Sequence, residues 1–198
     1  MRAALALACL IAAPAFAQDR PPLQPTRDVS VTYRLVGGSP GAPQGQEMRM
    51  SWLTGEGKMR VDMPGGIGWS VVDQKAQKVF VVMEAQRMVM DVPMEGAAMP
   101  SQPPASARFT RGGSETIAGQ SCTVWKYEDG GNTGEACLTA DGVMLRSTGT
   151  HAGQSGSVEA TNVAYGTQDP ARFRPPAGYQ PMQLPPGMAA PAGRPPAR

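Results

Sequence analysis

Apolar and polar side chains alternate along three segments in the first part of the chain, 29–35, 47–52 and 58–63. In the first of them, Val29, Val31, Tyr33 and Leu35 fall on one side and polar residues on the other. Successive side chains of a β-strand point to opposite faces, so a period of two predicts strands with one apolar face and one polar face. This pattern is typical of an antiparallel sheet that buries one face.

Similar segments recur along the rest of the chain and are separated by turn-forming residues. The run 79–83 is apolar at every position, which predicts a strand covered on both faces. No segment has a sustained helical period, although 169–173 can form one helical turn before Pro175. The predicted fold is mainly β, an antiparallel sheet of about ten or eleven strands with little helix. Further strands are expected at 69–72, 78–83, 87–92, 115–118, 122–127, 136–139, 143–147 and 158–165.

Residues 1–17 have the features of a cleavable signal peptide. Arg2 precedes an apolar run over 3–13, and the run is followed by Ala15-Phe16-Ala17, a small-x-small cleavage signature. The run is shorter than the ~18 residues that a membrane-spanning helix needs. We therefore expect cleavage after Ala17 and a periplasmic or secreted protein, with lipidation at Cys9 as the alternative.

Composition divides the rest of the chain into a leader, one β domain and a tail. Residues 18–27 are polar and rich in proline, 28–179 carry the strand pattern, and 180–198 are rich in Pro, Gly and Ala. A long loop is expected at 94–107, between two blocks that each have too few strands for a separate core. The composition of 180–198 predicts a disordered tail, with binding to a partner or to the cell wall as the alternative.

Two cysteines remain after signal removal, and in an oxidising compartment they are expected to form a disulfide between Cys122 and Cys137. Buried free thiols, or a redox or metal pair, are the alternatives. If Asp129 and Gly130 are the central residues of a type I′ turn, Cys122 lies directly opposite Cys137. Closing a loop of this length stabilises the fold by about 3 kcal/mol in the chain-entropy model.

Charge and histidine content argue against several classes of function. Removing Arg2 with the signal lowers the 18 basic residues to 17, against 16 acidic ones, which does not favour nucleic acid or anionic membranes as partners. The single histidine, His151, is expected in a solvated, glycine-containing loop, 148–153, without an obvious catalytic or metal-ligating partner. We expect no enzymatic activity, no cofactor and a monomer, although a carboxylate pair assembled from distant strands is left open.

Methionine is unusually abundant, with 13 residues, of which all but Met1 survive signal removal. Methionine fills gaps in ordinary cores, but its flexible thioether also suits surfaces that adapt to apolar ligands. A third interpretation is a Cu(I) site at Met48-x-Met50 and Met88-x-Met90, because thioethers are soft ligands. The candidate ligand-lining residues are expected to share one face of the first block, together with two tryptophans. They are Met48, Met50, Trp52, Met59, Val61, Met63, Trp69, Val81, Met83, Met88 and Met90.

Residues 28–179 resemble a family of exported bacterial proteins of unknown function. The resemblance rests on Met48-Arg49-Met50-Ser51-Trp52 and on the later segments Ile117 to Trp125 and Ala136 to Arg146. That family is similar to the LolA/LolB-like lipoprotein carriers, which implies a strongly curved antiparallel half-barrel around an apolar cavity. This chain departs from the carriers because it has no amphipathic helix to plug such a cavity, and its disulfide has no counterpart that we can assign.

The pattern and the resemblance together predict a periplasmic, non-enzymatic protein that binds an apolar ligand, such as a lipid or an acylated peptide, in a curved sheet. A lipid or a lipoprotein is therefore the expected partner. The alternative is a structural or interaction protein of the cell envelope that uses a sheet edge or the proline-rich tail. Cu(I) binding through methionine is the third hypothesis.

Overall fold

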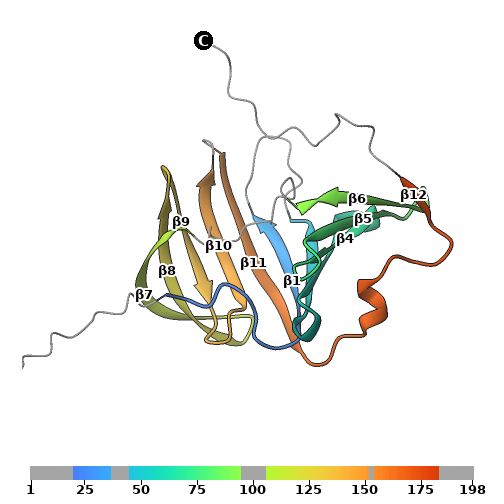
Figure 1. Cartoon of the computed structure of the whole chain (residues 1–198). Coiled ribbons are helices and arrows are strands. Elements are labelled where there is room, and N and C mark those ends of the chain that lie inside the picture. The colour runs from blue at the N-terminus through green and yellow to red at the C-terminus, as the bar shows by residue number, and fades with distance from the viewer. Residues whose placement is uncertain (1–19, 37–44, 95–105, 152–153, 183–198) are drawn as a thin grey trace, which may run out of the picture.

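The computed structural model describes residues 20–36, 45–94, 106–151 and 154–182. The predicted signal peptide with Cys9 and its cleavage site, most of the 94–107 loop and the tail from 183 onward lie outside these residues. Within the described ranges the chain forms one open, curved sheet of twelve strands (Figure 1). The predicted mainly-β, half-barrel fold is confirmed, with one or two more strands than expected.

The strands follow the order β12-β6-β5-β4-β3-β2-β1-β11-β10-β9-β8-β7 across the sheet. Every neighbouring pair is antiparallel except β12 and β6, which are parallel. Short 3₁₀ turns lie at Thr54–Glu56, Pro64–Gly66 and Pro170–Phe173. The strands are β1 Val29–Val36, β2 Glu47–Leu53, β3 Lys58–Asp62, β4 Gly68–Asp73, β5 Lys78–Met83, β6 Met88–Pro93, β7 Arg108–Ile117, β8 Gln120–Asp129, β9 Asn132–Leu138, β10 Met144–His151, β11 Gln154–Tyr165 and β12 Gln180–Met182.

The sheet bends into two limbs, which Figure 1 shows on either side of β1. The first limb consists of β2–β6 and β12, and the second of β7–β11. Register shifts interrupt the ladders at Thr32/Tyr33, at Met144/Arg146 and at Arg111/Ser114. Such bulges bend a strand and increase its twist, so these irregularities account for part of the curvature.

Apolar side chains from both limbs meet on the inner, concave face in one core. Tyr33, at the centre of β1, is fully buried there, and its hydroxyl donates to the Met144 carbonyl over 2.7 Å. Burial raises the pKa of Tyr33 far above its usual range, because the phenolate has no solvent around it. The alternation predicted for 29–35 is thus confirmed, and β1 is the strand at which the two limbs join.

A second, smaller core lies on the outer face of the first limb. It is covered by residues 166–182, which we call the C-terminal strap, and Phe173 of the strap is only 1% exposed. The predicted helical turn is confirmed there as the 3₁₀ turn Pro170–Phe173, capped by the Asp169 carboxylate, which accepts from the Ala171 N–H at 2.9 Å. This face was expected to be polar along 58–62, whereas the prediction that 79–83 is covered on both faces is confirmed, because Val79 lies in the main core and Val82 in the outer one.

Trp69 belongs to the outer core, so its predicted place on the methionine face is wrong. Its partner across the β3–β4 ladder is Asp62, which alternates with the inward-facing Val61. The Arg60 guanidinium stacks on the Trp69 ring at 3.8 Å. The indole N–H donates to Glu84 at 2.7 Å, and the Tyr179 hydroxyl of the strap donates to the same carboxylate. Because these two bonds favour the charged form, they lower the pKa of Glu84.

The described part of the predicted leader, which begins at Arg20, packs against the turn between β9 and β10. The Thr26 N–H donates to the Asp141 carbonyl at 2.9 Å, and the Arg27 guanidinium pairs with the Asp141 carboxylate at 2.6 Å. Gly142 has a φ of +86°, and a side chain there would collide with the Gln24 carbonyl. The leader therefore lies against a turn that only glycine can form.

Asp141 also accepts hydrogen bonds from the hydroxyls of Thr139 and Tyr165. Partial burial raises the pKa of Asp141, but the hydrogen bonds from Thr139 and Arg27 outweigh it and leave the pKa below its usual value.

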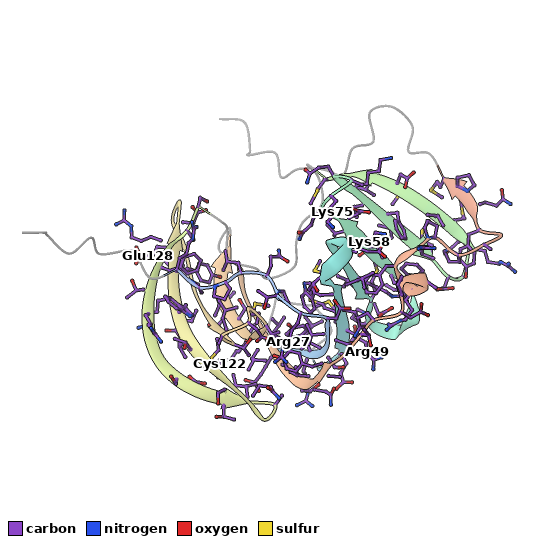
Figure 2. The ribbon with its side chains drawn as sticks, turned by 60° about the horizontal axis from the view of Figure 1, so that its bottom comes forward. Arg27, Arg49, Lys58, Lys75, Cys122 and Glu128 are labelled. Carbon is purple, nitrogen blue, oxygen red and sulfur yellow. A yellow bond between two sulfur atoms is a disulfide. The ribbon has the colours of Figure 1, made fainter. Side chains whose placement is uncertain are left out.

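The predicted disulfide is present, but the predicted register of its hairpin is wrong. Gly130 and Gly131, both with positive φ, form the two-residue turn, so Asp129 pairs with Asn132 and Cys137 pairs with Val124. A type I′ turn needs positive φ at both central positions, which two glycines meet with least strain. The bond to Cys122 is therefore diagonal, with a Cα–Cα distance of 5.4 Å. Figure 2 shows Cys122 on the second limb.

Two other predicted boundaries need correction. Residues 180–182, assigned to the disordered tail, form β12 against the edge of β6. The 148–151 segment with His151, expected to be a loop, is the end of β10. Gly149 is a packing residue there, because a side chain would collide with the Tyr127 hydroxyl.

Candidate functional site

Side chains on the inner face of the first limb form rows that cross the strands. One row runs from Met50 through Val61, Ser70, Val81 and Met90 to Met182. Met50 is 2% exposed, whereas the row is half-buried from Ser70 to Met182. The inner face is therefore filled where the limbs join and accessible toward β5, β6 and β12.

The predicted lining residues divide into three groups. Met48, Met50, Trp52, Met59 and Val61 are buried in the main core. Trp69 lies in the outer core. The half-buried residues are Met63, Val81, Met83, Met88 and Met90.

The accessible part of the inner face is a patch rich in thioethers. Met83 pairs directly with Met88 across β5 and β6, and side chains opposite each other in an antiparallel pair are within contact distance. Gly68, the ladder partner of Met83 on β4, adds no side chain to this surface. A Cβ at Gly68 would collide with the Val82 carbonyl. We call this surface the thioether patch. It consists of Met63, Val81, Met83, Met88, Met90, Val92, Met94 and Met182.

Sequence reasoning missed three members of the patch. Val92 and Met94 continue the alternation of Met88 and Met90, which was the available signal. Met182 joins the patch because β12 pairs with β6, and β12 was not predicted because the composition of 180–198 indicated a disordered tail.

The two methionine pairs considered for Cu(I) do not form one site. Met48 and Met50 are buried on β2, whereas Met88 and Met90 are half-buried on β6, with β3, β4 and β5 between them. Across the described ranges, no three His, Cys, Asp or Glu side chains are grouped as metal ligands.

Trp52 has an unusual place at the end of β2. Its side chain is 5% exposed, and its indole N–H has no hydrogen-bond acceptor among the described residues. It pairs with Val29 on β1 and with Met59 on β3, both buried. A polar group is thus enclosed by apolar side chains on the face that carries the thioether patch.

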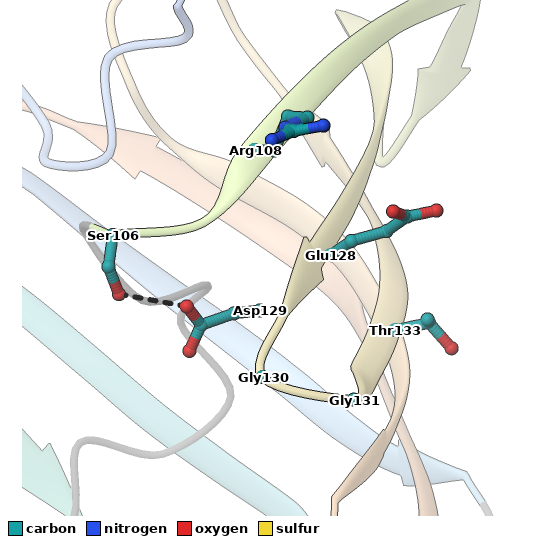
Figure 3. Close-up of a pocket in the computed structure, with 7 residues that line it drawn as sticks. All are labelled: Ser106, Arg108, Glu128, Asp129, Gly130, Gly131 and Thr133. Atoms are coloured by element: carbon teal, nitrogen blue, oxygen red, sulfur yellow. Dashed lines mark hydrogen bonds between the residues drawn. The ribbon is translucent and has the colours of Figure 1, made fainter.

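A polar pocket of about 400 Å³ lies at the tip of the β8–β9 hairpin (Figure 3). Arg108, Glu128 and Thr133 follow one another across β7, β8 and β9, and the Ser106 hydroxyl donates to Asp129 at 3.0 Å. This pocket is on the second limb, away from the thioether patch, and is lined by charged residues, hydroxyl-bearing residues and glycines. Across the described part of the chain, no helix is long and apolar enough to span a membrane.

Comparison with known families gives one match. The model of a family described as Domain of unknown function (DUF4412) covers residues 41–157. A search of curated proteins gives no match.

Several solved structures are similar to this chain at low sequence identity, two of those described here with TM-scores above 0.5. An uncharacterized conserved protein from Thermus thermophilus has a TM-score of 0.55 at 14% identity over 80% of this chain and 91% of that one. The MucA/MucB complex of Pseudomonas aeruginosa has a TM-score of 0.52 at 15% identity over 82% of this chain and 62% of that one, so this chain spans less than two thirds of it. A domain described as outer membrane lipoprotein-sorting, from Vibrio parahaemolyticus, has a TM-score of 0.40 at 12% identity over 75% and 89%. The predicted resemblance to a family of unknown function is confirmed by the family match.

Proposed function

The chain belongs to the DUF4412 family, a domain of unknown function, and we propose that it binds an apolar ligand at the thioether patch. The ligand is a lipid or an acylated peptide, and the protein acts outside the cytoplasm as a carrier or sensor and not as an enzyme. The signal-like residues 1–17 and the disulfide support this location.

The observation that carries the proposal is the gradient of burial on the inner face. Side chains that only filled a core would be buried along the whole row, as Met50 and Val61 are. The patch instead leaves half-buried apolar side chains next to that core, and a contiguous apolar surface of this kind marks a binding site in soluble proteins. Flexible thioethers can adjust to the variable shape of an acyl chain.

A protein partner is the second candidate, favoured by the edge strand β7. It ends the sheet, has ten residues and is exposed along most of its length, so its outer backbone groups can pair with an added strand. MucB, which shares the fold, is described in complex with MucA. A photo-crosslinker at Thr116 on β7, compared with one at Gln86 in the β5–β6 turn, would detect such a partner in the envelope.

The main proposal is tested with the mature chain, residues 18–198, unfolded, delipidated, refolded and mixed with bacterial membrane extract. Native mass spectrometry should then show protein with added lipid mass. Met90→Glu places a charge in the patch and should abolish the added mass, whereas Ala85→Glu, in the exposed turn, should not. Absence of lipid uptake by the unsubstituted protein, or equal uptake by both variants, would refute the proposal.

A further inference from the structure

The methionines of the described ranges fall into two classes of exposure. Of these ten side chains, four are buried in the main core, with exposed fractions of 1–9%. The buried ones are Met48, Met50, Met59 and Met144. The other six are half-buried, and all of them belong to the thioether patch. Within the described part of the chain, every accessible thioether is therefore on one surface.

Strand register places thioethers of the patch next to one another. Met83 pairs with Met88 across β5 and β6, which Figure 1 shows as neighbouring strands. The Met63 N–H donates to the Gly68 carbonyl at 2.9 Å, and Gly68 is in turn the ladder partner of Met83. Because glycine has no side chain, none lies between Met63 and Met83 in this row. A polar group introduced at one of these methionines would therefore lie beside other thioethers.

The cysteines of the mature chain do not compete with these thioethers for an oxidant. Cysteine thiolates are sensitive targets of oxidation, but Cys122 and Cys137 are bonded to each other. The remaining cysteine of the sequence, Cys9, lies in the expected signal peptide. Accessible methionines are thus the sulfur atoms of the described chain that an oxidant can modify.

Oxidation would change what the patch can bind. Methionine sulfoxide is polar, whereas the thioether from which it forms is apolar and flexible. An acyl chain that covered the sulfoxide oxygen would remove its water without supplying a hydrogen-bond donor, which is unfavourable. The side chains that suit an apolar ligand therefore also make its binding sensitive to oxidants.

We propose that the thioether patch is a site of oxidative modification, at which a hydroperoxide converts methionines to sulfoxides and the patch loses affinity for apolar ligands. The sulfur lone pair attacks one oxygen of hydrogen peroxide, the O–O bond breaks and a sulfur–oxygen bond forms. The sulfur is oxidised by two electrons, and the departing oxygen leaves with both protons as water. The modification depends on exposure alone, whereas its effect on binding rests on the proposed function.

The modification is tested on the mature chain, residues 18–198, by brief treatment with hydrogen peroxide, proteolysis and mass spectrometry of the peptides. Met59 and Met63 are a matched pair, because they are close in sequence but Met59 is 1% exposed and Met63 is half-buried. Met63 and the other patch methionines should be oxidised at least about tenfold faster than Met59. In concentrated urea the two rates should become similar. Equal rates in the folded protein would overturn the inference.

The effect on binding is tested with radiolabelled methyl hexadecanoate in equilibrium ultrafiltration, before and after peroxide treatment. Treatment should weaken binding to the unsubstituted protein about tenfold or more. A variant with all six patch methionines replaced by leucine stays apolar but has no sulfur there to oxidise, so its affinities before and after treatment should be equal. The control, Met59→Leu with Met144→Leu, removes two buried thioethers and should remain sensitive to peroxide.

The outcomes separate this inference from the proposed function. If the probe does not bind the untreated protein, the apolar-ligand proposal fails and the effect on binding fails with it, while the peptide rates still decide the modification. If the probe binds and the patch is oxidised without loss of affinity, the effect on binding is overturned and the apolar-ligand proposal stands. Equal sensitivity of the six-leucine variant and the unsubstituted protein would show that oxidation acts elsewhere.

Discussion

Replacing Phe173 by alanine tests whether the C-terminal strap is an integral part of the fold. The ring is 1% exposed and packs in the outer core with Leu53, Trp69, Val71 and Val82. Removing a buried phenylalanine ring costs about 3–5 kcal/mol, from lost burial and from the cavity left behind. Domains of this size have total stabilities of about 5–15 kcal/mol, so the variant should remain folded but lose a large share of its stability.

Urea unfolding followed by tryptophan fluorescence measures this loss. Trp69 is a built-in reporter, because its ring is covered by Arg60, and Arg60 itself donates to the Arg172 carbonyl of the strap at 2.7 Å. Arg174→Ala, at an exposed neighbour of Phe173, is the matched control and should change the free energy of unfolding by less than about 0.5 kcal/mol. A loss below about 1 kcal/mol for Phe173→Ala would refute the described packing of the strap.

Three further predictions concern the second limb and the leader. Replacing Cys122 and Cys137 together by alanine should lower the free energy of unfolding by about 3 kcal/mol in urea titrations, since the bond closes a separation of 15 residues; an unchanged midpoint would contradict this. Gly142→Ala should lower the thermal midpoint more than Gly119→Ala, because both glycines have positive φ but only Gly142 faces a neighbouring carbonyl; equal shifts would argue against the packing of the leader. The pKa of Asp141 is lower in the folded state, so its stabilising effect is present above the unfolded pKa of about 4 and is lost as the pH falls through the folded value. Urea midpoints of Asp141→Asn should therefore fall less steeply between pH 6 and pH 2 than those of the unsubstituted protein, and parallel profiles would exclude this contribution.

The parts of the fold that could be predicted are those in which local pattern and tertiary environment agree. Strict alternation located β1, β2 and β3, because one face of each is apolar, and Asp169-Pro170 located the 3₁₀ turn. The disulfide followed from compartment and cysteine number. The register of the disulfide-bearing hairpin could not be predicted in this way. Asp129, Gly130 and Gly131 all accept turn geometry, and the ladder of β8 and β9 decides which two form the turn.

Other features depend on neighbours that are distant in sequence. Residues 69–72 are apolar at three of four positions, so either face of that strand is compatible with burial, and only the β3–β4 register assigns Trp69 to the outer core. In the first half of β7 only Phe109 is half-buried, so this strand has no apolar alternation. The gradient of burial across the thioether patch arises from the curvature of the whole sheet, which no local pattern records. Trp52 was predicted to line the site, but its unpaired N–H becomes visible only in the folded chain.

The short strand β12 covers one edge of the open sheet. An open sheet has two ends, and without Gln180–Met182 one of them would be β6, a strand with Met88 and Met90 beside unpaired backbone. The other end is β7, so the uncovered edges of two copies could pair head to tail, a contact that repeats without closing and builds fibres. Proline at position 181 cannot donate a hydrogen bond to an additional strand. Among the described residues, Gln180–Met182 thus cover the β6 edge, and removing this strand by proteolysis before Gln180 should increase edge-to-edge association of copies.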